Sequence, residues 1–295
     1  MRSPFGKTSL FAAVIVAAVS LPSVHLHAAS TQQPQISTTT KQNSARDMLR
    51  QREHLDPQWP EVQAHMPNPS TASADQMETA ADVLRARRFY EDAIDYYRYA
   101  IKAGGEAWAI YNKIGITDIE VARYGDATLC FKRATALNKK SSESWNNLGV
   151  VAYLQHNYSA AIMGYKRAIL LNPNVATFHS NLGTAYFEDK QFARANKEYT
   201  ASLQIDPDIF EHHDVTGITA HLMQPDDHAR FCFAMARIYA LAHDEQNMLH
   251  YLAKAREAGY SIKQEMAGDR AFAPYRSDPR VIAVIKNQMP LSVEN

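Results

Sequence analysis

The chain has 295 residues, of which 46% are hydrophobic and 21% charged, and its formal net charge is zero. This is the composition of an ordinary soluble protein, long enough for one helical array or two compact domains. The charge balance argues against a generic binder of nucleic acids or anionic membranes, because such proteins usually carry a basic excess.

Residues 1–29 have the pattern of a secretory signal peptide. Arg2 and Lys7 precede an apolar run over residues 10–21, and small residues follow at Ala28 and Ala29. The run is shorter than the roughly 20 apolar residues that span a bilayer, which favours a cleaved signal over a membrane anchor. No cysteine lies near the cleavage site, so no lipid anchor is expected. The pattern predicts a periplasmic or secreted protein.

Residues 30–73 are rich in Thr, Gln, Pro and Ser and lack a sustained apolar period. We expect a polar, largely disordered leader, with one or two helical turns over residues 46–54 at most. Trp59 is the exception in this segment. It is expected to pack against the folded part of the chain, and the alternative is that it meets a partner.

From residue 74 the chain repeats itself every 34 residues. The four copies are residues 74–107, 108–141, 142–175 and 176–209, and we number the positions of each copy as columns 1 to 34. A small residue recurs at column 20, as Ala93, Ala127, Ala161 and Ala195, and an aromatic ring recurs at column 24, as Tyr97, Phe131, Tyr165 and Tyr199. Small residues let two antiparallel helices approach closely, and rings fill the space beside them. A fixed period of this length predicts a solenoid, because one repeat cannot bury its apolar face alone.

The repeated columns resemble the tetratricopeptide repeat. Residues 142–175 match its pattern best, with Trp145, Leu148, Gly149, Ala161, Tyr165, Ala168 and Pro173 in place and Ala152 where a tyrosine is usual. The resemblance implies an all-α fold, a solenoid of antiparallel helix hairpins closed by a C-terminal capping segment.

The repeat register breaks after the fourth copy. Residues 210–228 form an insertion, which is either part of a binding surface or a spacer. Residues 229–262 are a degenerate fifth repeat, and residues 263–295 are a cap and tail in which Phe272, Tyr275 and Val281 are expected to cover the end of the stack.

In tetratricopeptide repeats the first helix of each unit lines a concave groove, so the resemblance implies a partner-binding site at columns 5, 9 and 12. These columns carry Asn112, Asn146 and Ser180, then Ile116, Val150 and Thr184, then Ile119, Tyr153 and Phe187. An apolar ladder edged by amides suits an extended or helical peptide segment. A second interpretation stays open, in which Tyr153 and Phe187 pack against neighbouring helices instead. The lysine and asparagine with which some family members hold a terminal carboxylate are missing from their columns.

No catalytic motif is present. The adjacent His212 and His213 lack metal-ligand spacing, and Cys130 and Cys232 lie about three repeat lengths apart, too far for a disulfide. The basic pairs that begin at Lys132 and Lys166 are expected to lie on solvated outer helix faces. The sequence therefore predicts a non-enzymatic scaffold for a protein or peptide, without metal or cofactor, without nucleic acid and without stable membrane insertion once the signal is removed. The alternatives are a self-associating homodimer and, less favoured, a metal-dependent enzyme built around His212.

Overall fold

The computed structural model describes residues 36–210 and 225–286, and these residues contain helices and turns but no strand. The predicted signal peptide, most of the insertion with its two adjacent histidines, and the tail from residue 287 lie outside the described residues. The chain divides between Gln155 and His156 into two compact units.

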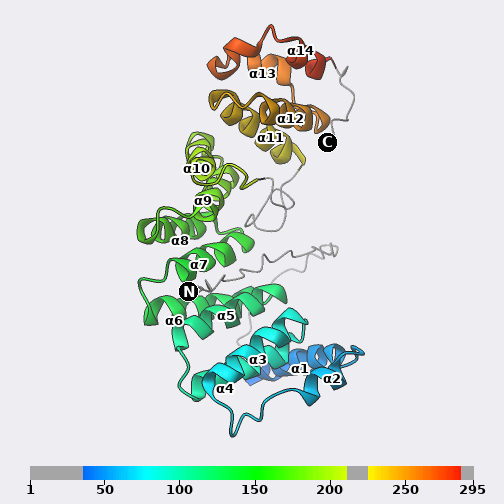
Figure 1. The fold of residues 1–295 in the computed structure, drawn as a ribbon, viewed down its shortest axis with the longest axis vertical. Coiled ribbons are helices and arrows are strands. Elements are labelled where there is room, and N and C mark those ends of the chain that lie inside the picture. Colours follow the sequence, from blue (N-terminus) through cyan, green and yellow to red (C-terminus); the bar gives the residue numbers. More distant parts are fainter. Residues whose placement is uncertain (1–35, 211–224, 287–295) are drawn as a thin grey trace, which may run out of the picture. The chain divides into compact units, whose positions relative to one another are not determined.

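The first unit contains seven helices among its described residues (Figure 1). They are α1 (Ile36–Glu53), α2 (Trp59–Ala64), α3 (Ala74–Ala86), α4 (Tyr90–Lys102), α5 (Ala107–Glu120), α6 (Tyr124–Leu137) and α7 (Ser142–Leu154). Helices α3 and α4 form one hairpin and α5 and α6 the next, and α7 packs on α6.

The second unit continues with α8 (Tyr158–Leu171), α9 (Ala176–Glu188), α10 (Phe192–Ile205), α11 (Pro225–Leu241), α12 (Glu245–Glu257), α13 (Ile262–Gly268), the 3-10 helix η2 (Arg270–Tyr275) and α14 (Pro279–Ile285). Helices α9 and α10 pair as a hairpin, as do α11 and α12. The predicted all-α fold of antiparallel helix hairpins is confirmed.

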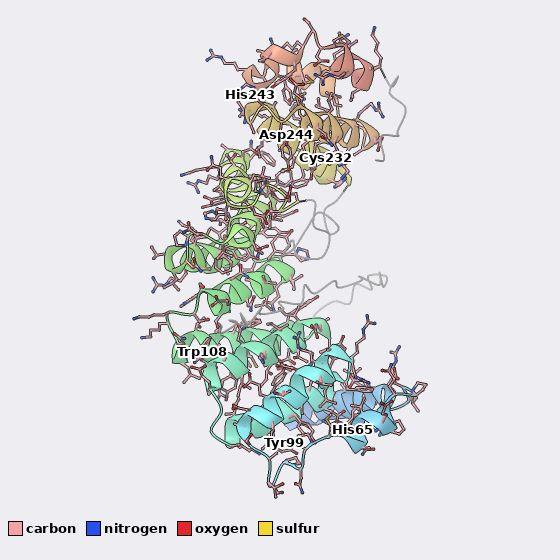
Figure 2. The ribbon with its side chains drawn as sticks, viewed as in Figure 1. His65, Tyr99, Trp108, Cys232, His243 and Asp244 are labelled. Atoms are coloured by element: carbon pink, nitrogen blue, oxygen red, sulfur yellow. The ribbon has the colours of Figure 1, made fainter. Side chains whose placement is uncertain are left out.

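The turns that follow α3, α5, α7, α9 and α11 share one backbone geometry. The residue at column 15 adopts a left-handed conformation with φ between 56° and 67°, and the five residues are Arg88, Ala122, His156, Lys190 and His243. None of them is a glycine, so each turn holds a side chain in a region that costs about 1 kcal/mol. His243 and Asp244 form the turn between α11 and α12 (Figure 2), which places residues 229–262 in the same register as the other copies.

The hairpins close on the columns that the sequence singled out. The column-20 alanines and the column-24 rings of the four regular copies are fully buried. In two hairpins the partner of the ring is a glycine at column 8. A Cβ added to Gly115 would lie 2.7 Å from the Phe131 ring, and one added to Gly183 would lie 2.6 Å from the Tyr199 ring. The helices of these hairpins therefore lie at a separation that only glycine permits.

A matched pair of glycine substitutions tests this packing. Gly115→Ala should destabilise the protein by about 1–3 kcal/mol, because the new methyl group overlaps a buried ring. Gly125→Ala on α6 faces open space, so it should raise stability by up to about 1 kcal/mol through the better helix propensity of alanine. Urea unfolding followed by circular dichroism measures both. Equal effects of the two substitutions would contradict the close approach.

The amino-terminal segment differs from the predicted leader. From Ile36 onward it forms α1 and α2, which pack on the first hairpin. Arg50 pairs with Asp95 at 2.5 Å, and the Nε2 atom of His54 lies 2.7 Å from Asp92. The Trp59 ring stacks on His54, with centroids 3.7 Å apart, and lies 5.0 Å from the Phe89 ring.

Charge pairing explains why composition alone predicted disorder here. The basic residues of α1 have few apolar neighbours in the sequence, but they meet carboxylates of α4 that lie about 40 positions away. Trp59, together with the buried Val62, anchors the segment in the core of the first hairpin. The packing expected of Trp59 is confirmed.

Docking of α1 should depend on pH through Glu53. Its carboxylate accepts the backbone N–H of Glu91 at 3.3 Å, and burial raises the pKa of Glu53 to about 7. The facing charged groups are Glu91, which pairs with Arg123, and Asp92, which pairs with Arg50 and His54. Because the folded pKa exceeds the unfolded one, the stability that protonation gives is complete below pH of about 4.5 and is lost as pH rises through about 7.

We therefore expect the melting temperature of the unmodified protein to fall between pH 6 and pH 8, and that of Glu53→Gln to fall by less. At pH 8 Glu53→Gln should be the more stable of the two. Thermal unfolding at both pH values measures this. Glu61→Gln on the exposed side of α2 is the matched control and should leave the pH dependence unchanged. If the melting temperature of Glu53→Gln changed with pH as that of the unmodified protein does, the docking of α1 would not depend on the titration of Glu53.

The carboxyl-terminal residues cover the last hairpin as expected. Phe272, Tyr275 and Val281 are buried, and the Phe272 ring lies 5.3 Å from the Phe233 ring of α11. Arg237 of α11 pairs with Asp269 at 2.7 Å. Among the described helices, none has the length and hydropathy needed to cross a membrane.

Candidate partner-binding face

The predicted site residues lie on the first helices of the hairpins. We call the surface formed by columns 5, 6, 9 and 12 of α3, α5 and α7 the first-helix face; it belongs entirely to the first unit. Its residues from the sequence prediction are Asn112, Ile116, Ile119, Asn146, Val150 and Tyr153. Asn112, Ile116 and Val150 are half-buried, whereas the other three are buried.

Amide side chains link α5 to α7. The Nδ2 of Asn147 donates to the Oδ1 of Asn112 at 3.1 Å, and the Nδ2 of Asn146 donates to the Oδ1 of Asn147 at 3.3 Å. Asn147 stands at column 6, next to the predicted column 5, and sequence reasoning missed it. Its carboxamide fixes that of Asn112. Within the described residues the Nδ2 of Asn112 has no hydrogen-bond partner, so it can donate to a ligand carbonyl.

Apolar side chains form the floor beside these amides. Ile116 and Val150 pack against a buried cluster that contains Ile119, Phe131 and Val151. Both remain partly accessible, because they are only half-buried. Column 9 thus offers apolar surface to a ligand, and column 12 mainly supports the core.

The α3 end of this face is charged, which the sequence prediction missed because it began with the second repeat. The same columns 5, 9 and 12 of the first repeat carry Glu78, Asp82 and Arg85. The Nζ of Lys113 lies 2.8 Å from Glu78 and 2.6 Å from Asp82. Arg85 pairs with Glu120 at 3.0 Å.

Burial acts on the ionisation of this charged cluster. Burial disfavours the charged form of Lys113, but the hydrogen bonds that its ammonium donates to Asp82 and Glu78 outweigh this effect, so the pKa of Lys113 is raised. Burial also raises the pKa of Glu120, although Arg85 opposes the shift. These three ion pairs tie α3 to α5 and give the face alternating charge.

The three predicted residues of α9 lie in the second unit and serve its packing. The Phe187 side chain is only 1% exposed, and its ring lies 5.1 Å from Phe192 and 6.1 Å from Phe231. Ser180 and Thr184 are also buried, and Thr184 accepts a hydrogen bond from the Tyr199 hydroxyl at 3.3 Å. Of the two interpretations left open by the sequence, the structure favours packing for Phe187.

Phe187→Ala should therefore act on stability. Removing a fully buried ring costs about 3–5 kcal/mol, since the cavity adds to the lost burial. Leu241→Ala, which removes an exposed leucine of the same unit, should change stability by less than about 0.5 kcal/mol. Urea unfolding midpoints compare the two. A small effect of Phe187→Ala on the unfolding midpoint would contradict the burial of this ring and would count it among the accessible residues.

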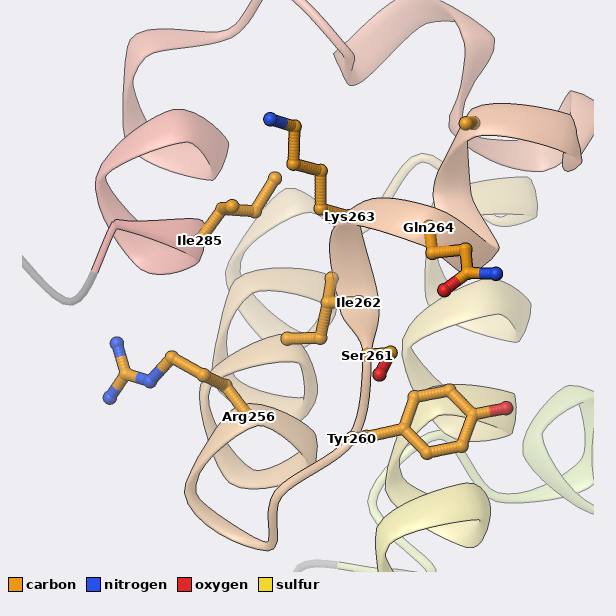
Figure 3. A pocket seen from close by; sticks show the side chains of 8 residues that line it. Arg256, Tyr260, Ser261, Ile262, Lys263, Gln264 and Ile285 are labelled. Atoms are coloured by element: carbon orange, nitrogen blue, oxygen red, sulfur yellow. The ribbon is translucent and has the colours of Figure 1, made fainter.

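An open pocket of about 660 Å³ lies at the carboxyl-terminal cap (Figure 3). Arg256, Tyr260, Ile262, Lys263 and Gln264 are among its lining residues. The Arg256 guanidinium donates to the carbonyl of Val284 at 2.9 Å and so serves the fold. Ser261 also lines it, and among the described residues no hydrogen bond joins its hydroxyl to the Lys263 amine. Binding of a small polar group is the chemistry the lining offers.

The cysteines are not poised for chemistry. Both are free. Burial raises the pKa of the Cys130 thiol to about 12 and that of the Cys232 thiol to about 11, which disfavours the reactive thiolate. Among the described residues, no group of three or more His, Cys, Asp or Glu side chains is arranged to hold a metal ion.

Comparison with known proteins agrees with the hairpin architecture. The family model for the tetratricopeptide repeat matches residues 142–175. No curated protein sequence matches the chain.

Several solved structures are similar in fold. A MamA crystal structure aligns with 63% of this chain and 96% of its own, at 22% identity and a TM-score of 0.44. The structure of YrrB, described as a TPR protein with an unusual peptide-binding site, aligns with 63% of this chain and 87% of its own, at 19% identity and a TM-score of 0.44. The Pseudomonas aeruginosa pilF structure aligns with 80% of this chain and 98% of its own, at 19% identity and a TM-score of 0.49. The repeat at residues 142–175 is of the tetratricopeptide type.

Proposed function

We propose that this protein is a non-enzymatic scaffold that binds a peptide or protein segment on the first-helix face. The observation that carries the proposal is the amide pair of Asn112 and Asn147. One carboxamide is held in place by the other, and its Nδ2 donor has no partner within the described residues. A half-buried donor held in a fixed orientation is suited to a peptide carbonyl, because little side-chain freedom is lost on binding.

The neighbouring side chains fit the same kind of ligand. Ile116 and Val150 offer accessible apolar surface one helical turn from the amides, so a segment can place an apolar side chain there while its backbone meets Asn112. The ion pairs of α3 with Lys113 and Glu120 border this surface and favour a segment with polar side chains at that end. The face thus combines backbone hydrogen bonding with side-chain selection.

A scaffold also accounts for the remaining polar groups better than an enzyme does. The buried carboxylates of the first unit, such as Glu91 and Asp118, are paired with Arg123. Burial raises the pKa of Asp118 to about 6, but its place inside the hairpin keeps it from any substrate. These groups hold helices together.

We place this activity in the cell envelope, on the basis of the basic, apolar and small-residue pattern of residues 1–29. Amino-terminal sequencing of the protein recovered from a periplasmic extract tests the placement. A mature chain that begins near residue 29 or 30 would support it, and an intact amino terminus on cytoplasmic protein would contradict it.

Peptide binding is tested with a random peptide library panned against the full chain. The affinity of enriched peptides is then measured by fluorescence anisotropy. Asn112→Ala should weaken binding about fivefold, the equivalent of one lost hydrogen bond of about 1 kcal/mol.

Gln204→Ala, which removes an exposed amide from the outer helix α10, is the control and should leave the affinity unchanged. Circular dichroism should show the same helix content in both variants. Failure to enrich any peptide, or enriched peptides that bind Asn112→Ala and wild type equally, would refute the first-helix face as the site.

A further inference from the structure

The outer surface of α6 combines exposed leucines with basic side chains that have no ion-pair partner within the described residues. Leu129 is 63% exposed and Leu137 59% exposed, which is unusual for leucines of a packed helix. Lys132 and Arg133 lie on the same helix face, because spacings of three, four and eight residues bring side chains to one side. Lys139 and Lys140 follow directly in the exposed loop before α7. We call these six residues the basic outer face.

The charges on this face are not neutralised locally. Residues 129–140 contain four basic residues and no acidic one. Within the described residues, Lys132, Lys139 and Lys140 have no ion-pair partner, and Arg133 meets only the Tyr111 ring and hydroxyl. The acidic residue at the start of the helix, Asp126, lies 3.6 Å from Arg46. The zero net charge of the whole chain therefore conceals a local cationic surface.

The second unit carries the same combination at the same columns. Helix α8 contains no acidic residue, and its Met163, Lys166 and Leu170 are exposed. Met163 stands at column 22, as Leu129 does, and Lys166 at column 25, as Lys132 does. The outer helices α4 and α10 carry Asp95 and Lys197 at column 22 instead. At columns 22 and 25, an apolar residue followed by a lysine occurs in α6 and α8 but not in α4 or α10.

We propose that the basic outer face docks on the surface of an anionic lipid bilayer. Lysine and arginine attract acidic headgroups over about a Debye length, and leucine side chains that project between them enter the boundary with the acyl chains. Trp145 lies next to the face, since its indole N–H donates to the Lys139 carbonyl at 3.1 Å. Tryptophan side chains are favoured at such boundaries.

The shape of the face favours a lipid surface over an acidic protein segment. An amphipathic partner helix needs a hydrophobic groove to lie in. Here the apolar side chains project from an exposed helix side, and their relative exposures show that they are not the walls of a cleft. A deformable bilayer accepts projecting side chains of this kind. The contact is peripheral, so it requires no membrane-spanning helix.

Flotation with unilamellar vesicles tests the proposal on the full chain. One set of vesicles contains equal parts of phosphatidylcholine and phosphatidylglycerol, and the other contains phosphatidylcholine alone. Binding to the neutral set measures any contribution of the apolar run at residues 10–21 and is subtracted. We expect binding that requires the anionic lipid and weakens as salt is raised.

Lys132→Gln combined with Lys139→Gln and Lys140→Gln should reduce the anionic-lipid partition coefficient by about 100-fold, since each cation near the surface contributes about fivefold. The matched control neutralises Lys197, Lys263 and Lys286, three exposed lysines of the second unit, and should retain most of the binding. Leu129→Ser with Leu137→Ser should reduce binding severalfold, whereas Leu55→Ser with Leu241→Ser should not.

Three results would overturn the proposal. The first is equal loss in the two triple lysine variants, which would show attraction without a defined face. The second is full binding by the variant that lacks Leu129 and Leu137, which would show that no apolar contact is made. The third is capture of polyglutamate by the wild-type protein without any binding to the anionic vesicles, which would assign the face to an acidic polypeptide.

Discussion

The close approach of the two helices in each hairpin is the constraint on which the rest of the structure depends. In the α5–α6 and α9–α10 hairpins the aromatic ring at column 24 lies against the glycine at column 8, and the alanine at column 20 is fully buried. This contact fixes how the first and second helices are separated and which side of each faces outward. This contact also sets where the binding surfaces lie. Residues at the same exposed column of successive repeats line up only when the hairpins share one geometry.

The sequence was sufficient for this architecture because buried columns restrict residue type. The alanines and rings of the four regular copies recur at a fixed period and are all buried, so the all-α fold of helix hairpins could be predicted from the sequence. The turns could not. The left-handed position at column 15 holds Arg88, Ala122, His156, Lys190 and His243, and these side chains share no property, since the geometry is imposed by the packed helices on either side.

Ion pairs between distant residues explain the largest difference between sequence and structure. Arg50 and His54 look like part of a disordered polar segment, yet they meet carboxylates of α4. Composition averages charge over a window, whereas pairing depends on which side chains the fold brings together.

The candidate site shows the same limit of sequence-based prediction. Columns 5 and 9 indicated Asn112 and Ile116, which are half-buried. The hydrogen bond between Asn112 and Asn147, the charged α3 end and the burial of Phe187 depend on how neighbouring helices pack.

The distribution of charge links the two surfaces that remain available for binding. On the first-helix face, Lys113 and Arg85 are neutralised by Glu78, Asp82 and Glu120, so recognition there must come from fixed hydrogen-bond donors and small apolar areas. On the outer side of α6, the lysines have no such partners in the part of the chain that the structure describes. One hairpin can carry both surfaces because its first and second helices expose different sides to solvent. The core residues lie on neither of these exposed sides. Substitutions on the outer helix can therefore change what one surface attracts while the donors on the first helix keep their geometry.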